Sequence, residues 1–395
     1  MKRLFYIFVL VLSVLSCEKE GGKNVTLSVT PQDITAPFTT SSQTFDIVSN
    51  GTWTIEVLTP DGLQAPWARL DYQTGKGNAT VKVRVYRNEY KNDRIAVVSV
   101  TSESGKTVKC TLTQAGDPDS EDVSDELLVR IGTFNLRGSW TADKDEWSYE
   151  NRKTRLIRVI NDCDFDVFGV NEYGLACQSY FQQEIGNKYN IRIFSPYSQD
   201  GIGDRAIAII YKKNFTLKEF HYFWLADDPE TLHMYDTGYS YPPACVGILA
   251  DNQTGIEFCM IVTHGPSDEE TNLKYCGLYE EWNKKFNPEA KPAFLVGDMN
   301  FRSGSPEMGY DPDPEYLQYS KYWKDSYINA PTVKGPFCTY NGFNMSRNLW
   351  THPSRIDYIW YNNATPVLYV NHDTLYGGYY ASDHQPIYVD MIIRE

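Results

Sequence analysis

The chain has 395 residues and a formal net charge of −14, with 42% hydrophobic and 14% aromatic residues. This composition excludes a disordered or collagen-like chain, and the length suffices for two domains and a large core. The charge is uneven, since residues 117–395 carry 24 of the 37 basic and 41 of the 51 acidic residues, a net −17. So acidic a domain has no overall attraction for a polyanion. The balance favours a small substrate, although acidic secreted nucleases keep nucleic acid open as an alternative.

The first segment reads "MKRLFYIFVLVLSVLSCEKEGGKN". Lys2 and Arg3 precede an apolar stretch that is too short to span a bilayer, which is typical of a cleaved signal. We interpret residues 1–17 as a lipoprotein signal peptide with a lipobox, because the small Ser16 precedes Cys17 and a polar tether follows it. A lipid on Cys17 would hold the protein at the outer membrane or cell surface, on the periplasmic or extracellular face. The alternative is an ordinary secretory signal in which this cysteine has no role.

Residues 25–116 have the alternating pattern of short strands. The stretches are "TFDIVSNGTWTIEV", "ATVKVRVYRN" and "RIAVVSVTSESGKTVKCTLTQ", with turns expected at Asn50-Gly51 and Ser104-Gly105. Such spacing predicts a small all-β, immunoglobulin-like sandwich. The acidic segment 117–126 that follows is interpreted as a linker.

Several short sequence motifs in this segment also resemble those of a known family. Trp53 lies in "GTWTI", Trp67 in "PWARL", a Gly-x-Gly falls at Gly75 and Gly77, and the segment closes with "TQAG". In this order they resemble a BACON domain. The resemblance implies either glycan binding or a spacer role. We expect both tryptophans in the core rather than on an exposed sugar platform.

From Leu127 onward the pattern changes to mixed strands and helices. Strands are expected in "LLVRIGTFNL", "DFDVFGVNEYG", "GDRAIAIIYKK", "IEFCMIVTHG", "PAFLVGDMN", "SRIDYIWYN" and "HQPIYVDMII", and helices in "YENRKTRLIRVIND" and "YCGLYEEWNKKF". The expected strands and helices do not strictly alternate along the chain. Residues 127–395 are therefore predicted to form two packed sheets flanked by helices, not one doubly wound sheet.

Polar residues that suit metal or phosphate chemistry follow the apolar strands of this second domain. Taken singly, each has a structural explanation, such as a turn or a local ion pair. Taken together, they indicate one site at a common rim of the sheets, because charges at the ends of buried strands converge if the strands lie side by side. The residues are Asn135, Glu172, His264, Asp298, Asn300, Asp357, Asp383 and His384.

The short sequence motifs around these residues resemble those of the endonuclease/exonuclease/phosphatase superfamily, whose fold is that of pancreatic deoxyribonuclease. "GDMN" and "SDHQP" are the most specific, and "TFNL", "NE" and "RIDYI" occur in the right order. The resemblance covers roughly residues 127–395. "WSYENRKTRLIRVIND", "FWL" and "TYNGF" further resemble a secreted bacterial branch. The resemblance implies an α/β four-layer sandwich with its site at one edge of the two sheets.

The resemblance also implies a divalent metal, Mg²⁺ with Mn²⁺ as a substitute. Glu172 would be its main ligand, with Asn135 nearby and Asp383 assisting metal or water. Oxygen ligands of this kind suit these hard cations.

The remaining residues receive catalytic roles from the same resemblance. Asp298 would accept a proton from the attacking water, and Asn300 would hydrogen-bond a phosphate oxygen. Asp357 would orient His384, whose imidazolium would stabilise the developing charge. His264 would act as an acid or hydrogen-bond donor at the leaving oxygen. These roles meet the needs of phosphate-ester hydrolysis, in which charge must be neutralised and a leaving group must depart.

The sequence departs from the family pattern around His264. Gly265 and Pro266 follow it, where many members have a hydrophobic residue and an aspartate. Where members place an acidic partner for this histidine, the sequence has Arg205, with Asp204 one residue away, and in a strand that shift changes the face. Either Asp204 reaches the site through a bulge or the acidic partner is missing. In the second case Arg205 could hold a phosphate.

The leading hypothesis is a membrane-anchored, Mg²⁺-dependent phosphoesterase that acts on phosphodiesters or phosphomonoesters. The substrate could be a small molecule, a sugar phosphate, a lipid headgroup or nucleic acid, and a surface endonuclease is the nearest alternative. A non-catalytic glycan-binding surface lipoprotein is the rival from another class. We expect a monomer. Seven cysteines after Cys17 lack any CxxC pair, so they are expected to be buried and need no disulfides.

Overall fold

The computed structural model describes residues 26–60, 65–90, 93–120, 126–139, 142–194, 206–231 and 242–394. The predicted lipidation site Cys17 and the residues Asp204 and Arg205 lie outside these ranges. None of the helices within them has the length and apolar character needed to cross a membrane.

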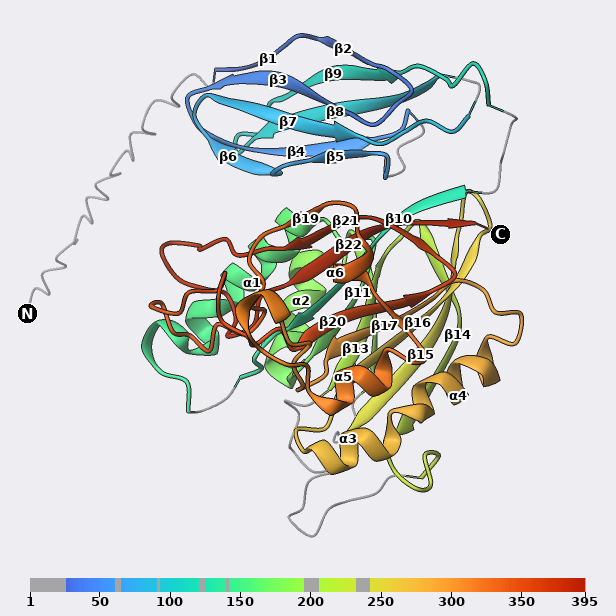
Figure 1. Cartoon of the computed structure of the whole chain (residues 1–395). Helices are drawn as coiled ribbons and strands as arrows, with labels where there is room; N and C mark the ends of the chain where they lie inside the picture. The colour runs from blue at the N-terminus through green and yellow to red at the C-terminus, as the bar shows by residue number, and fades with distance from the viewer. Residues whose placement is uncertain are drawn as a thin grey trace, which may run out of the picture.

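The first part of the chain folds into two facing sheets, drawn in blue and cyan in Figure 1. One sheet has the order β1-β3-β7-β5 and the other the order β2-β9-β8-β4-β6. The strands of the first are β1 (Leu27–Thr30), β3 (Ser41–Ser49), β7 (Ala79–Val85) and β5 (Ala68–Leu70). Those of the second are β2 (Asp33–Ala36), β9 (Thr107–Gln114), β8 (Arg94–Ser102), β4 (Thr52–Leu58) and β6 (Thr74–Lys76). The predicted all-β sandwich is confirmed.

Alternation along these strands places every second side chain in a shared core. In β7, for example, Val81, Val83 and Val85 are all fully buried. Trp53 and Trp67 belong to the same core, with 2% and 7% of their surface exposed. The prediction that they are core residues is confirmed, so neither offers an exposed platform for a sugar.

The second part of the chain forms two larger sheets. The seven-stranded sheet consists of β12 (Tyr189–Phe194), β13 (Ile207–Lys212), β11 (Val167–Asn171), β10 (Glu126–Asn135), β22 (Ile387–Arg394), β21 (Thr365–Asn371) and β19 (Val333–Lys334), in that order. The six-stranded sheet consists of β14 (Phe215–Trp224), β15 (Pro243–Asp251), β16 (Glu257–His264), β17 (Ala293–Asp298), β20 (Asp357–Asn362) and β18 (Lys324–Asp325). An apolar cluster contributed by both sheets fills the space between them.

Helices cover the outer faces of these two sheets (Figure 1). They are α1 (Tyr149–Cys163), α2 (Leu175–Ile185), α3 (Glu269–Tyr275), α4 (Gly277–Phe286) and α5 (Pro314–Tyr319). The short α6 (Ser326–Asn329) instead packs Tyr327 against the core between the sheets. The first two pack on the seven-stranded sheet, and the next three pack on the six-stranded sheet. The predicted pair of packed sheets with flanking helices is therefore confirmed, and all seven cysteines of the described residues are buried and free.

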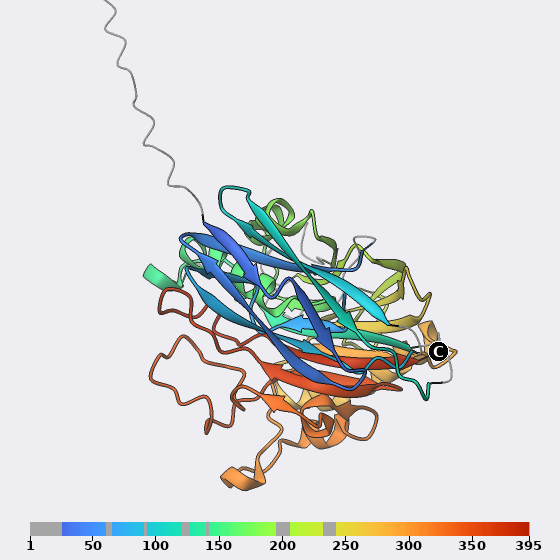
Figure 2. The same ribbon diagram turned by 90° about the horizontal axis from the view of Figure 1, so that it is seen from above.

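The small sandwich lies over a part of the seven-stranded sheet that α1 and α2 leave uncovered, as Figures 1 and 2 show. Buried charges join the two units. Arg69 on β5 pairs with Asp164 and Asp166, which lie between α1 and β11. Tyr86, just after β7, donates a hydrogen bond to Asp390 on β22. Burial of this kind is typical of a permanent contact rather than of two tethered domains.

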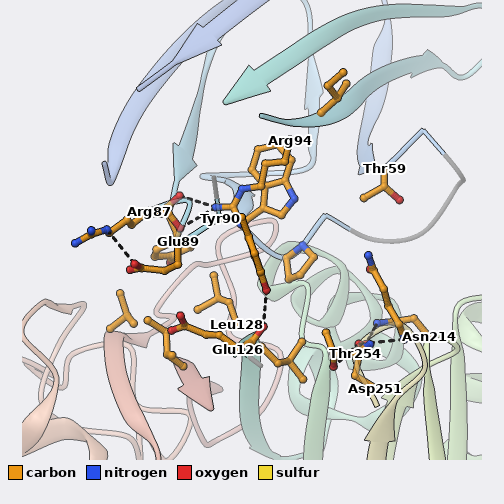
Figure 3. Close-up of a pocket in the computed structure, with 18 of the residues that line it drawn as sticks. Thr59, Arg87, Glu89, Tyr90, Arg94, Glu126, Leu128, Asn214, Asp251 and Thr254 are labelled. Carbon is orange, nitrogen blue, oxygen red and sulfur yellow. Dashed lines mark hydrogen bonds and ion pairs between the residues drawn. The ribbon is translucent and has the colours of Figure 1, made fainter. Parts of the chain in front are cut away.

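A cavity of about 450 Å³ opens at the same junction (Figure 3). Trp67 and Tyr90 line it from the sandwich, and Leu128 and Asp251 line it from the two larger sheets. Across it, Tyr90 donates a hydrogen bond to the Glu126 carbonyl. No candidate site residue lines this cavity, so it is separate from the predicted site.

Candidate active site

The strand ends carry the predicted site residues to one edge of the two large sheets. In the seven-stranded sheet, β10 and β11 run parallel, and Asn135 at the end of one pairs with Asn171 at the end of the other. In the six-stranded sheet, β16 and β17 run parallel, and Asp298 pairs with His264 on one side and with Asp357 on the other. Because parallel strands end at the same edge, these side chains meet.

The first residue of "GDMN", Gly297, must be glycine for a steric reason. Gly297 has φ +145°, and a Cβ built on it would lie 1.9 Å from the carbonyl oxygen of Thr263. Any other residue would push β16 and β17 apart at the point where His264 and Asp298 stand opposite each other. The glycine therefore keeps these two strand ends close.

Asp357, His384 and Asp298 form a buried relay. Asp357 Oδ2 lies 2.9 Å from His384 Nδ1, and His384 Nε2 lies 3.6 Å from Asp298 Oδ2. The first contact makes Nδ1 the ring nitrogen that carries a proton toward Asp357. Thr339 fixes the other end of the relay, because its Oγ1 accepts a hydrogen bond from the Asp357 amide at 3.1 Å.

Asn135 links this relay to Glu172. Its Nδ2 donates to Glu172 Oε1 and to Asp298 Oδ2, each at 3.1 Å. Two carboxylates from different sheets thus converge on one buried amide. Of the predicted metal ligands, Asn135 and Glu172 are therefore in direct contact.

His264 and Asn300 flank Asp298 on its other side. His264 Nε2 lies 3.5 Å from Asp298 Oδ2 and remains partly exposed. The Asn300 backbone amide donates to Asp298 Oδ1 at 3.0 Å, while its side chain donates to the Gly265 carbonyl at 2.9 Å. Among the described residues, the carboxylate that pairs with His264 is Asp298. The predicted partner Asp204 lies outside the described residues.

Asp383 completes the group from the loop before β22. Its Oδ2 lies 3.5 Å from Nη1 of Arg137, and the neighbouring Ser382 hydroxyl donates to the Asn135 carbonyl. The loop that carries Asp383 and His384 is thereby tied to the end of β10.

Burial and neighbouring charges shift the pKa values of the site. Burial alone would lower the pKa of His384, but Asp357 and Asp298 outweigh it and raise that pKa well above the usual value. The pKa of Asp298 is raised because the carboxyl group is buried, despite the two histidines beside it. Burial also raises the pKa of Asp383. The site thus pairs an imidazolium with carboxylates that are better proton acceptors than usual.

Backbone strain marks the same edge. Arg137, Glu172 and Asn300 have φ values of 55°, 53° and 58°, in the left-handed region that non-glycine residues seldom adopt. Such conformations cost roughly 1–3 kcal/mol each and cluster at functional sites. Each residue lies just after a strand end, where the chain turns sharply to present a side chain.

Several supporting residues were not predicted from the sequence. Asn171 accepts a hydrogen bond from the Asp298 amide and donates to the Thr263 carbonyl, so it joins the two sheets at the site. Arg152 on α1, and Arg137 and Thr339 in loops, are further supporting residues at this edge. The signal for Asn171 was present, because it directly precedes Glu172 in the same strand-end motif.

The donor set fits a divalent cation. Asp298, Asp357 and His384 can bring ligand atoms within 4.8 Å of one another, but the hydrogen bond inside this trio suits a proton relay better. Glu172 and Asp383 offer hard oxygen atoms nearby, and Glu172 contributes to the raised pKa of Asp383. Carboxylates crowded in this way gain stability from a cation of the Mg²⁺ type.

Comparison with known proteins agrees with this architecture. A sequence model of the Endonuclease/Exonuclease/phosphatase family matches residues 132–384. No curated protein matches at a significant level.

Solved structures share the fold at low identity. An endonuclease/exonuclease/phosphatase family protein from Bacteroides thetaiotaomicron is 22% identical with a TM-score of 0.59, covering 68% of this chain and 96% of that one. A mannosyl-6-phosphatase from Bacteroides thetaiotaomicron VPI-5482 is 21% identical with a TM-score of 0.56, covering 67% of this chain and 99% of that one. A conserved protein of unknown function from Enterococcus faecalis V583 is 20% identical with a TM-score of 0.59, covering 67% of this chain and 100% of that one. With its family model matched over most of its length, the chain belongs to the endonuclease/exonuclease/phosphatase family, whose members are phosphoesterases and nucleases.

Proposed function

We propose that the protein hydrolyses phosphate esters with the help of Mg²⁺, for which Mn²⁺ can substitute. The observation that carries this proposal is the continuous contact from Asp357 through His384 and Asp298 to Asn135 and Glu172. These contacts support the proposal because they join, at one buried edge, residues that can serve as a proton acceptor, a cationic donor and oxygen ligands. Phosphate-ester hydrolysis needs these three elements together.

In this reaction the oxygen of water adds to phosphorus and the ester P–O bond breaks. Asp298 accepts the proton of the attacking water, a role suited to its raised pKa. His384 stays cationic and donates to a non-bridging oxygen, while Asp357 fixes its ring. His264 donates a proton or hydrogen bond to the departing alcohol, and Asn300 donates to a second non-bridging oxygen.

The metal would be held by Glu172, Asn135 and Asp383. When bound, it would neutralise phosphate charge and polarise the reacting phosphoryl group. These carboxyl groups are buried at the strand ends, and a cation among them would replace the water that burial removes.

A surface endonuclease is a weaker candidate than a hydrolase of small esters. Residues 117–395 carry a net charge of −17, from 24 basic and 41 acidic residues, where a nuclease needs cations along its groove. Lipid attachment at Cys17 and display at the outer membrane or cell surface are part of the proposal. For the BACON-type sandwich the proposal keeps both alternatives, glycan binding and a spacer role.

The test is a hydrolysis panel with the purified chain from residue 26 onward. The panel holds a chromogenic phosphomonoester, a chromogenic phosphodiester, plasmid DNA and phospholipid headgroup esters, each with Mg²⁺ or with EDTA. Activity that needs metal and is lost in a His384→Ala variant supports the proposal. Inactivity on the whole panel, in a folded protein that does not bind Mg²⁺, would contradict it and favour a non-catalytic scaffold.

A further inference from the structure

The cavity between the small sandwich and the large sheets has the size of a small-molecule site. Its volume is about 450 Å³, and it lies where two folded units meet, which is a common place for ligand pockets. Buried ion pairs hold the two units together, so the cavity is formed before any ligand enters. Three of the residues that line it, Pro60, Asn252 and Gln253, are also exposed to solvent, so a ligand can reach it.

Arg94 on β8 contributes a cation to the wall of this cavity (Figure 3). Its Nε donates to Gln114 Oε1 at 2.8 Å, and its Nη2 donates to the carbonyls of Tyr86 and Arg87 at 2.8 and 2.9 Å. The guanidinium carbon lies 4.5 Å from the centre of the Trp67 ring. Within the described part of the chain, Nη1 has no hydrogen-bond partner and no carboxylate forms an ion pair with Arg94. The group is therefore held in place while one of its nitrogens can still donate.

Two carboxylates that act on Arg94 from a distance, those of Glu89 and Glu126, contact other arginines. Glu89 pairs with Arg87 and Glu126 pairs with Arg394, each at 3.1 Å. Burial lowers the pKa of Arg94 to about 9, although both carboxylates favour its charged form. A guanidinium in this environment gains stability from an anion that contacts it directly.

Asp251, the third acidic residue of the wall, is also engaged elsewhere. It belongs to the large sheets, across the cavity from Arg94 (Figure 3). Its Oδ2 accepts hydrogen bonds from the amides of Gln253 and Thr254 at 3.2 and 2.8 Å, and from the Thr254 hydroxyl at 3.0 Å. This carboxylate therefore stabilises the turn between β15 and β16 and does not neutralise Arg94.

Apolar side chains line the cavity where the two units meet. Pro66 comes from the sandwich, and Leu128, Val367 and Ile392 come from β10, β21 and β22 of the seven-stranded sheet. A ligand in contact with these side chains would remove apolar surface from water. The cavity thus combines a cationic donor with apolar contacts, a combination that suits an acid with an apolar body.

We propose that this junction cavity binds a small organic acid, with its carboxylate on Nη1 of Arg94 and its apolar body against Pro66, Leu128 and Ile392. Such a ligand would neutralise a cation that the described residues leave without an ion pair. It would also contact both folded units at once, so binding would stabilise the whole chain against unfolding. The site is separate from the proposed phosphoesterase reaction, because none of the residues given a role in that reaction lines the cavity.

The test measures binding of two acids, phenylacetate and hexanoate, and of their neutral matches, phenylacetamide and hexanamide. Saturation-transfer NMR titrations use the chain from residue 26 onward, with EDTA present so that no metal at the active edge binds the acids. At least one acid should bind at millimolar or lower concentration and raise the melting temperature. Its amide should bind about tenfold more weakly or less, because the charge-assisted hydrogen bond is lost.

Three variants locate the binding. Arg94→Met should weaken binding of the acid by about tenfold, to the level of the amide. Val367→Trp fills the cavity from the side of the large sheets without changing Arg94, and it should abolish binding of both acid and amide. Arg158→Met is the matched control, since it makes the same change on the exposed side of α1 and should leave binding unchanged.

Equal affinity of the wild type for acid and amide would overturn the inference, and so would a failure of both acids to bind. Unchanged affinity in a folded Arg94→Met or Val367→Trp variant would overturn it as well, because the acid would then bind elsewhere. Melting temperatures show which variants fold. If Arg94→Met does not fold, the comparison of acid with amide and the Val367→Trp variant decide.

Discussion

The junction between the small sandwich and the large sheets yields the most quantitative prediction. Replacing Arg69 with methionine should lower the free energy of unfolding of the chain from residue 26 onward by about 2–3 kcal/mol. Arg69 is 4% exposed and pairs with Asp166, which is 2% exposed, so water cannot compensate the loss. Methionine keeps much of the apolar stem and removes the charge.

The size of the expected loss in unfolding free energy depends on the contacts that Asp164 and Asp166 keep when Arg69 is replaced. Breaking a buried ion pair costs roughly 3–5 kcal/mol when it leaves a lone charge. Here Asp166 keeps Lys212 at 2.9 Å and the Arg130 amide at 2.8 Å, and Asp164 keeps Lys188 at 2.9 Å. Neither carboxylate is left alone, so the expected loss lies below that range.

Urea unfolding followed by tryptophan fluorescence measures the effect. The wild type should unfold in one transition, because the sandwich and the large sheets share buried charges. Lys109→Met, on the exposed side of β9, is the matched control and should change stability by less than about 0.5 kcal/mol. A change in Arg69→Met as small as this, or two separate transitions in the wild type, would refute the idea of a permanent junction.

Three further predictions concern the site and the pH response. His384→Ala should lower kcat by about 10²- to 10⁴-fold and Asp357→Asn by roughly 10- to 100-fold, measured on the best ester, with KM changing less. Mg²⁺ should raise the melting temperature by an amount that Glu172→Gln removes, since saturation at about 100 times Kd adds about 2.7 kcal/mol; no shift in the wild type would argue against a metal site. Burial alone would raise the pKa values of Asp164 and Asp166, but their cationic partners outweigh burial and lower both pKa values below 3.8. The unfolded chain therefore binds more protons in acid, and urea titrations should show stability lost as pH falls below about 4, at up to about 1.4 kcal/mol per pH unit and group.

Much of the site could be predicted because its residues end apolar strands. Asn135, Glu172 and Asp298 each follow a run of buried residues, and strand periodicity fixes where such runs stop. Parallel neighbours then bring the ends together without any further information. Their chemical roles came from the family resemblance and remain predictions.

The junction was not predictable in the same way. Arg69 and Asp166 are 97 positions apart, and neither local sequence indicates the other as a partner. Tyr86 and Asp390 are 304 positions apart. These charges are buried only because the sandwich packs against the large sheets, and no local sequence pattern predicts that contact. Arg152 was missed for a related reason, since its partners are backbone carbonyls of distant loops.

The junction and the active edge lie at different positions along the same strands. Arg130 on β10 pairs with Asp390 at the junction, and Asn135, at the end of that strand, reaches the site, about 16 Å away at roughly 3.3 Å per residue. Likewise Asp166 precedes β11 and Glu172 follows it. Removing the sandwich would therefore expose buried charges on the strands that carry the site. The protein is best regarded as one folded unit, and its activity should be measured on the chain that contains both parts.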